Sequence, residues 1–217
     1  MATQHVGVIG SGIVGQVLAA GFARHGFATM IGSRNPGNLA EWSAGTAPPV
    51  ATGTVEETAR FADIVVLAVK GTAAGEAVRL AGPDALAGKT VIDATNPIAD
   101  VPPEGGVLKF FTDLDSSLME LLQEAAPEAH FVKAFSCVGN ALMVNPDLPG
   151  GPPTMFICGN DAAAKQEVVR ILERFGWESE DMGGAVAARA IEPLCILWCI
   201  PGFLNNQWLH AFKLLKP

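Results

Sequence analysis

The chain has 217 residues, of which 49% are apolar and 17% charged, and its formal net charge is −8. This composition excludes a disordered chain and is typical of a compact domain with one hydrophobic core. The excess of acidic side chains also argues against nucleic acid and anionic membranes as partners.

Neither the cysteines nor the most apolar segment indicates a metal centre or a membrane span. Cys195 and Cys199 lie four residues apart in an apolar run, so we expect packing residues on one helix face. That run, residues 193–204, contains Pro201 and is shorter than the roughly 18 residues of a membrane-spanning helix. The first ten residues lack the pattern of a signal peptide. We therefore expect a cytoplasmic protein with no metal and no membrane partner.

Short β-branched runs alternate with amphipathic stretches along most of the chain. The expected strands are residues 5–9, 27–31, 63–69, 90–95, 130–135 and 154–159, and the expected helices are residues 13–25, 55–61, 73–81, 113–125 and 161–175. Thr54 and Glu57 predict a capping box at the start of the second helix. The unbroken apolar run at 63–69 is typical of a strand covered on both faces. This alternation predicts an α/β fold, a doubly wound parallel sheet of the Rossmann type.

Two loops and a change of pattern interrupt this alternation. Residues 96–107 and 144–153 are rich in proline and glycine, and the first of these loops follows a strand, where ligands collect in such sheets. After Gly176 the pattern becomes one or two apolar helices. We therefore expect one sheet domain over residues 1–180 and a helical segment over 181–217.

The first expected strand runs directly into a glycine-rich turn. Residues 10–15 read Gly-Ser-Gly-Ile-Val-Gly, and this G-x-G-x-x-G pattern between a strand and a helix is the fingerprint of dinucleotide binding. Gly10 permits the tight turn, Gly12 lets a pyrophosphate approach the backbone, and Gly15 lets the helix pack against the strand.

The end of the second expected strand indicates which nicotinamide cofactor binds. A carboxylate at this position bonds the ribose hydroxyls of NAD and repels a 2′-phosphate. This chain has instead Gly32, Ser33, Arg34 and Asn35. A hydroxyl, a guanidinium and the backbone amides of a short loop suit that phosphate, so the predicted cofactor is NADP.

Seven segments together resemble one family. They are residues 6–15 (VGVIGSGIVG), 31–36 (IGSRNP), 63–70 (DIVVLAVK), 91–97 (VIDATNP), 131–140 (FVKAFSCVGN), 155–161 (MFICGND) and 181–193 (DMGGAVAARAIEP). In this order they resemble the NADP oxidoreductases that use the deazaflavin coenzyme F420, over nearly the whole chain. The same type of domain is similar to the cytoplasmic reductase part of membrane ferric reductases, so the resemblance leaves the acceptor open.

The resemblance implies roles for particular residues. It implies that the pyrophosphate is bound by Ser11, Gly12, Ile13 and Val14, and the 2′-phosphate by Ser33 and Arg34. Val69 and Lys70 would line the path from adenosine to nicotinamide. The residues expected near the nicotinamide are Asn96, Pro97 and the stretch 136–140, which includes Gly139 and Asn140. The C-terminal helices would cover the acceptor and pair two subunits as a homodimer.

One position departs from the family pattern. Members often carry proline and an aromatic residue where this chain has Lys70 and Gly71. Two interpretations of the lysine stay open: it reaches a phosphate or an acidic acceptor, or its stem lies along the strand end with its charge in water.

Hydride transfer between a nicotinamide and a flavin-like ring needs stacked rings and exclusion of water, and no protein acid or base at the carbon. We therefore expect no catalytic side chain, and the absence of tyrosine excludes a tyrosine–lysine reductase mechanism. The expected acceptor is a small molecule, coenzyme F420, with a flavin, a quinone-like ring or a ferric chelate as alternatives. Further alternatives are a non-catalytic NADP sensor and a dehydrogenase of hydroxy or imino acids. The dehydrogenase would need a larger helical domain than this chain offers.

Overall fold

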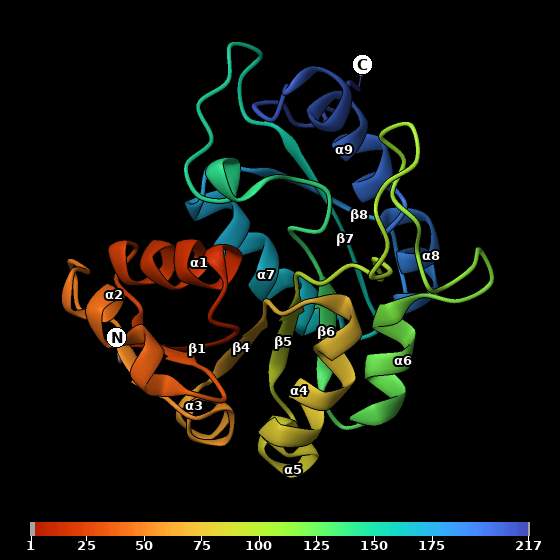
Figure 1. Cartoon of the computed structure of the whole chain (residues 1–217). Helices are drawn as coiled ribbons and strands as arrows, with labels where there is room; N and C mark the ends of the chain where they lie inside the picture. Colours follow the sequence, from red (N-terminus) through yellow and green to blue (C-terminus); the bar gives the residue numbers. More distant parts are fainter. Residues whose placement is uncertain (1–2, 217) are drawn as a thin grey trace.

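The β-branched runs form one eight-stranded sheet in the computed structural model, which describes residues 3–216. The strands are β1 (His5–Ile9), β2 (Ala28–Gly32), β3 (Ala51–Gly53), β4 (Ile64–Leu67), β5 (Thr90–Asp93), β6 (His130–Lys133), β7 (Thr154–Gly159) and β8 (Glu178–Asp181). Their order in space is β3-β2-β1-β4-β5-β6-β7-β8 (Figure 1). The winding reverses between β3 and β4, so the carboxyl ends of β1 and β4 meet at the switch point where ligands bind in such sheets. The six predicted strands are confirmed.

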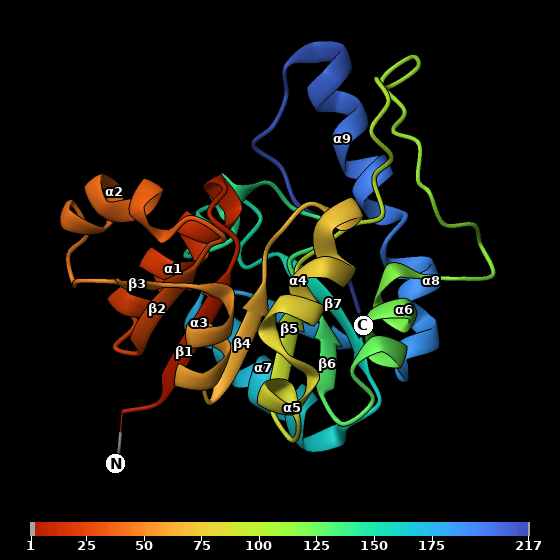
Figure 2. The same ribbon diagram turned by 60° about the horizontal axis from the view of Figure 1, so that its bottom comes forward.

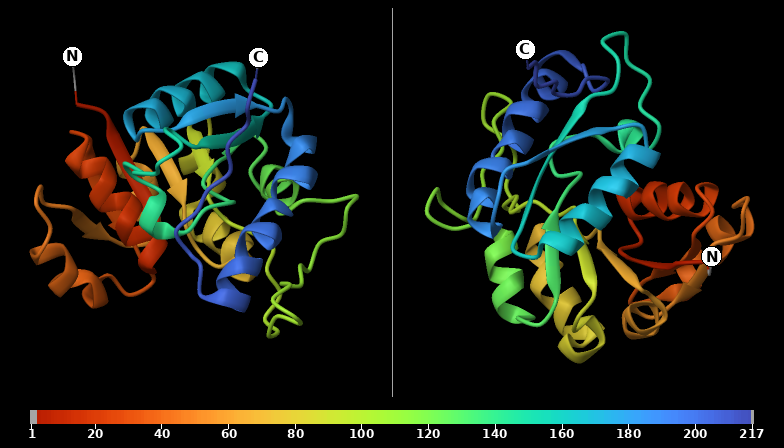
Figure 3. Two further views of the ribbon diagram at one scale, coloured as in Figure 1. Left: turned by 90° about the horizontal axis from the view of Figure 1, so that it is seen from above. Right: turned by 180° about the vertical axis from the view of Figure 1, so that it is seen from behind.

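Helices cover both faces of the sheet, as a doubly wound fold requires. They are α1 (Ile13–Arg24), α2 (Ala40–Ala44), α3 (Val55–Phe61), α4 (Ala74–Ala81), α5 (Pro83–Leu86), α6 (Leu118–Ala125), α7 (Ala162–Arg174), α8 (Ala188–Ile191) and α9 (Leu194–Asn205). In the view of Figure 1, α1 and α7 lie above the central strands and α3, α4 and α6 below them. The same layers are seen from above and from behind in Figure 3.

Strand β4 shows why the central runs are apolar without alternation. Ile64 and Val66 belong to the core cluster that α1 and α7 cover. Val65 and Leu67 point the other way, into the cluster under α3, α4 and α6. Successive side chains of a strand face opposite sides of the sheet, so a strand between two helical layers buries every residue.

The sheet is not wholly parallel, which corrects the sequence-based prediction. β7 pairs antiparallel with β6, and β8 then runs parallel to β7. The connection from β6 to β7 contains only a short 3₁₀ helix, Asn140–Leu142, and lacks the covering helix that a parallel crossover uses. Two strands were not predicted: β3 has three residues, and β8 reads Glu-Ser-Glu-Asp without an apolar face.

Two capping boxes fix where helices begin. Thr54 accepts a hydrogen bond from the Glu57 amide while the Glu57 carboxylate accepts from the Thr54 amide, as predicted. Ser117 and Glu120 make the same arrangement at the start of α6. α6 therefore begins at residue 118 and not at 113, because Asp113 holds the preceding residues in a turn by accepting from Ser116 Oγ.

The C-terminal segment is helical only in part. α9 ends at Asn205, its capping residue Asn206 has a left-handed backbone (φ 54°), and residues 206–216 run back along the molecule without helix. This tail is joined to β7, since the Thr154 amide donates to Phe212 O. The prediction that residues 181–217 are helical is therefore wrong over residues 206–216, and residue 217 lies outside the described residues. By length and composition alone Ala185–Asn205 is apolar enough to cross a membrane, a test that core helices of soluble proteins also pass.

α9 and the loop of residues 96–111 stand side by side beyond the carboxyl ends of the central strands (Figure 2). They share a third, smaller apolar cluster formed by Leu108, Cys195, Trp198 and Cys199. The two cysteines on one buried helix face match the sequence-based expectation. The loop and α9 thus form one packed unit over the edge of the sheet where a ligand is expected.

Candidate cofactor site

The turn from β1 to α1 has the geometry that its three glycines predict. Gly10 has φ 136°, and a Cβ there would lie 2.1 Å from Ala68 O. A Cβ on Gly15 would lie 1.9 Å from Gly10 O, so the helix packs directly on the turn. Gly12 differs, because open space surrounds its Cβ position, and it begins α1 without a side-chain cap. The free amides at this helix start face outward, which suits an anionic group.

A cavity of about 400 Å³ extends from this turn to the end of β2. Its lining includes Gly10, Ser11, Gly12, Ser33, Arg34, Asn35, Asn38, Val69, Lys70 and Glu76. The loop after β2 is held in shape, since the Ser33 amide donates to Gly53 O and the Asn35 amide to Ser33 Oγ. Within residues 3–216 no carboxylate lies within ion-pair distance of Arg34. Arg34 is thus a cation without a fixed partner among the described residues, at the end of the cavity where a 2′-phosphate would bind.

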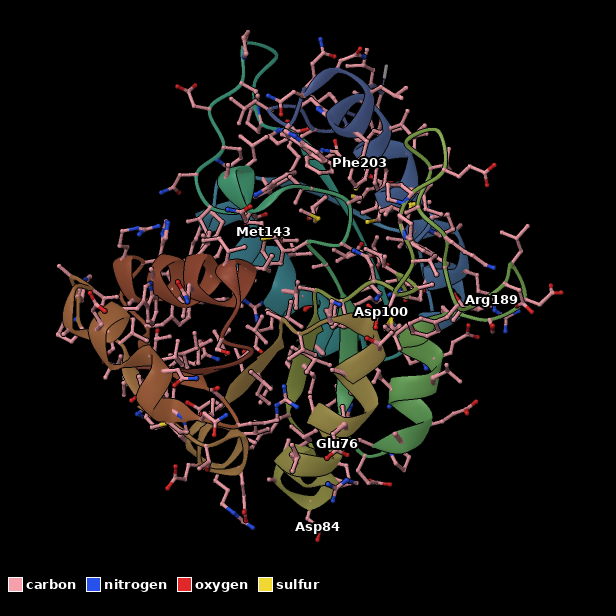
Figure 4. All side chains as sticks on the ribbon, in the orientation of Figure 1. Glu76, Asp84, Asp100, Met143, Arg189 and Phe203 are labelled. Carbon is pink, nitrogen blue, oxygen red and sulfur yellow. The ribbon has the colours of Figure 1, made fainter. Side chains whose placement is uncertain are left out.

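Glu76 is a lining residue that sequence reasoning missed. It lies on α4, where it pairs with Arg79 at 2.6 Å (Figure 4). The hydrogen bond from Arg79 lowers the pKa of Glu76, and Arg34 adds to this effect through space. Glu76 therefore places a negative charge on the cavity wall within the electrostatic influence of Arg34, at the end where adenosine would bind.

A second cavity of about 340 Å³ continues toward β5. It is lined by Gly12, Ile13, Val14, Ala68, Val69, Lys70, Gly71, Ala94, Thr95, Asn96, Ile98 and Asp100. Gly12, Val69 and Lys70 line both cavities, so the two form one path over the carboxyl ends of β1, β4 and β5. Val69 and Lys70 thus lie where the two cavities meet, and their position along a bound cofactor stays a prediction.

Lys70 forms an ion pair that sequence reasoning did not anticipate. Its Nζ lies 2.7 Å from Asp100 Oδ1, with both side chains largely exposed. Asp100 is on the 96–111 loop, beyond the start of α4 in Figure 4. The pair bridges the β4 and β5 loops at the rim of the second cavity, and it lowers the pKa of Asp100. The charge of Lys70 is therefore paired at the surface, and both interpretations of this lysine stay predictions.

The residues expected near the nicotinamide fall into two groups. Asn96 lines the second cavity, and its Nδ2 donates to Ser136 O at 2.7 Å. Asn96 Oδ1 and Ser136 Oγ are buried and without a hydrogen-bond partner among the described residues. Pro97, Gly139 and Asn140 line neither cavity. A Cβ on Gly139 would lie 2.6 Å from the Trp198 ring, so this glycine is a packing position against α9.

A buried ionic cluster lies behind Asn96. Lys133 Nζ lies 2.6 Å from Asp93 Oδ2 and 2.8 Å from Glu192 Oε1, all three side chains being almost fully buried. The ammonium donates a well-directed hydrogen bond to Thr95 O at 3.0 Å. Burial disfavours the ammonium, but the two carboxylates outweigh it and raise the pKa of Lys133. A charged residue at the end of an apolar strand, in VID and FVK, is the sequence signal that could have found this cluster.

Two of the buried cysteines, Cys137 and Cys158, line neither cavity. Burial raises the pKa of the Cys137 and Cys158 thiols to about 12, which keeps them protonated at neutral pH. Among the described residues no cluster of three His, Cys, Asp or Glu side chains is arranged to hold a metal ion.

Two comparisons place this architecture among known proteins. A family model described as coenzyme F420-dependent NADP oxidoreductase matches residues 5–97. The crystal structure of a protein assigned as an F420-dependent NADP-reductase, from Arthrobacter sp. FB24, superposes with a TM-score of 0.91 and 31% identity, covering 99% of this chain and 100% of that one. The chain belongs to the coenzyme F420-dependent NADP oxidoreductase family.

The family also connects the chain to larger reductases. It is 32% identical to rat Metalloreductase STEAP3 over 205 residues, which is 92% of this chain and 38% of that protein. Human Metalloreductase STEAP2 is 29% identical over 194 residues, covering 87% of this chain and 35% of that protein. The chain thus spans about two fifths of the length of these curated relatives.

Proposed function

We propose that the chain uses NADPH to reduce a flat, flavin-like small molecule by direct hydride transfer. The observation that carries this proposal is the continuous path of two cavities from Arg34, over the open Gly12 turn, to Asn96. The two ends of this path match the two ends of NADPH. Arg34, a cation without a fixed partner, would bind the 2′-phosphate, and the side-chain amide of Asn96 would bind the nicotinamide.

The donor set fits NADPH in detail. The amides of Ser11, Gly12 and Ile13 at the start of α1 would hold the pyrophosphate, and no side chain obstructs its approach at Gly12. Ser33 and Arg34 would bind the 2′-phosphate, with Asn35 shaping the loop. Asn96 would meet the carboxamide of the ring, since its Oδ1 has no protein partner. When bound, NADPH supplies the hydride, and the protein orients the ring and excludes water.

Among the described residues no histidine lines either cavity, and the Lys70–Asp100 ion pair is largely exposed at the rim of the second cavity; this supports an acceptor that takes hydride without a positioned proton donor. Coenzyme F420 is our first candidate, because the family model and the Arthrobacter structure share that description. A flavin or ferric chelate is the second, because the metalloreductase relatives match 92% and 87% of the chain.

Stopped-flow oxidation of NADPH with coenzyme F420, FMN and a ferric chelate in parallel tests the proposal. We expect one of the three to be reduced at a rate nearly flat between about pH 6 and 8, where an unperturbed histidine titrates. Tight NADPH binding with three inert acceptors would leave a non-catalytic sensor. A steep pH profile that one histidine substitution abolishes would point to a carbonyl or imine acceptor.

We also propose that two copies pair through α9 and that the protein acts in the cytoplasm, without nucleic acid or membrane partners. Leu197 and Leu204 on α9 are 55% and 58% exposed, an unusual number of large apolar side chains for one helix surface. Light scattering of the protein, with Leu197→Glu as the variant, tests this pairing: a monomeric wild type would exclude it.

A further inference from the structure

Lys133 contacts two segments that belong to different parts of the site. On one side is the loop after β5, which lines the second cavity at Thr95 and Asn96. On the other side is Glu192, which lies between α8 and α9. The same fully buried ammonium touches both.

The contacts on the β5 side fix Thr95 at three atoms. Asp93 Oδ1 accepts from the Thr95 amide at 2.9 Å and from Thr95 Oγ1 at 2.6 Å. The third atom is Thr95 O, which accepts a hydrogen bond from the Lys133 ammonium. The backbone that leads into Asn96 is thus determined by the ammonium and its carboxylate.

The contacts on the α8–α9 side are equally specific. Glu192 Oε2 accepts from the Leu118 amide at 3.0 Å and Oε1 from the Met119 amide at 3.1 Å, at the start of α6. α9 continues from this point and places Trp198 against Gly139. One buried carboxylate therefore joins the amino end of α6, the α8–α9 turn and Lys133.

The charges of this cluster are balanced by its surroundings. The Lys133 ammonium with the Asp93 and Glu192 carboxylates carries one net negative charge. The positive end of the α6 dipole points at the Glu192 carboxylate and balances part of that charge. A buried ion pair contributes little stability compared with apolar side chains of the same volume, but it tolerates only one arrangement of its members. Specification of geometry is therefore a better explanation for the cluster than stability.

We propose that Lys133 is a positioning residue: its ammonium holds the Thr95–Asn96 loop and the α8–α9 turn in one arrangement, so that NADPH binding at the loop also orders the acceptor side. This inference rests on the proposed function. It assigns the cluster a role in placing the two reacting rings, without contact to either.

Amide hydrogen exchange of the wild-type protein with and without NADPH tests the coupling and needs no acceptor. We expect NADPH to slow exchange at residues 10–15 and 94–98, and also at 188–196, although the last segment lines neither cavity. No protection at 10–15 would refute the NADPH site and the inference with it. Protection at 10–15 and 94–98 without protection at 188–196 would overturn the coupling alone.

Glu192→Gln provides the matching variant, because it keeps the side-chain shape and leaves Lys133 in a balanced pair with Asp93. Its control is Arg189→Gln, which breaks another ion pair between α8 and α6, Arg189–Glu120 at 2.7 Å, away from Lys133. We expect Glu192→Gln to bind NADPH as the wild type does, yet to lose the protection at 188–196.

The kinetic readout separates positioning from folding. With the acceptor that the wild type reduces, the single-turnover rate of Glu192→Gln at saturating NADPH should fall between about tenfold and a hundredfold, the range for a misplacement near 1 Å. Arg189→Gln should keep the wild-type rate. Equal behaviour of the two variants would overturn the inference. If Glu192→Gln does not fold, Asp93→Asn, which leaves Lys133 paired with Glu192, takes its place.

Discussion

Gly139, in the loop after β6, packs against Trp198 of α9: a Cβ on the glycine would lie 2.6 Å from the indole ring. Gly139→Ala should therefore destabilise the protein by about 1–3 kcal/mol, the usual cost of overpacking. Chemical denaturation measures this loss. Gly75→Ala is the control, because a Cβ there meets open space in a helix and should be neutral or stabilising. A Trp198→Leu background should relieve the loss, and a persistent loss would mean that the ring is not the cause.

Arg34 should determine the choice between NADPH and NADH. Arg34→Ala should weaken NADPH by about one to two decades, as expected for a charged contact of roughly 1.5–3 kcal/mol, and leave NADH nearly unchanged. Isothermal titration of both nucleotides measures this. Arg60→Ala, on α3 and paired with Glu56, should alter neither affinity. Equal losses for the two nucleotides would show that Arg34 does not contact the 2′-phosphate.

The two glycines at the start of α1 should respond differently to alanine. Gly12 has an ordinary φ of −74° and open space around its Cβ position, so Gly12→Ala should fold normally and weaken NADPH and NADH together. Gly15→Ala would bring a methyl group within 1.9 Å of Gly10 O, so the protein should lose stability. Thermal melting and nucleotide titration of both variants decide this. A Gly12→Ala protein with unchanged affinity would remove the pyrophosphate from this turn.

The raised pKa of Lys133 gives the stability a specific dependence on alkaline pH. The folded protein holds this proton more tightly than the unfolded chain, whose lysines titrate near 10.5. The stabilisation is thus fully present below pH 10.5 and is lost as the pH rises through the higher folded value. In the wild type the contribution of this group to the denaturation midpoint should stay constant from pH 9 to about 10.5 and fall as the pH rises further. In Lys133→Met the denaturation midpoint should be lower than in the wild type at every pH. Its dependence on alkaline pH should lack the contribution of this lysine.

The sequence predicted the parts of the fold that repeat a simple pattern. Val65 and Val66 face opposite cores, and an unbroken apolar run is enough to predict such a strand. The reversal at β7 was beyond that reasoning, because strand direction depends on the path of the β6–β7 connection and not on side-chain pattern. β8, reading Glu-Ser-Glu-Asp, has no apolar signal at all.

The site shows the same contrast between features that follow from a local sequence pattern and features that depend on contacts between distant residues. Arg34 and Gly12 both line the first cavity, and their location at strand ends could be predicted from local motifs of fixed spacing. Their roles toward the cofactor stay predictions. The Lys70–Asp100 pair and the Lys133–Glu192 contact join residues 30 and 59 positions apart, and local spacing carries no information about such contacts. Gly139 illustrates a third case: its location after β6 was correct, but its neighbour is Trp198 and neither cavity includes it.

The reversal of the last two strands has a consequence for which part of the chain lines the cavities. Since β8 runs opposite to β1–β6, it ends at the edge of the sheet away from the two cavities, and α8 and α9 then run back toward the opposite edge (Figure 2). The residues that line the two cavities all lie between Ile9 and Asp100, so the first half of the chain forms the cavity walls and the returning segment lies outside them. Insertions or substitutions in the returning segment can therefore change the surface beside the cavities while the residues of their walls stay the same.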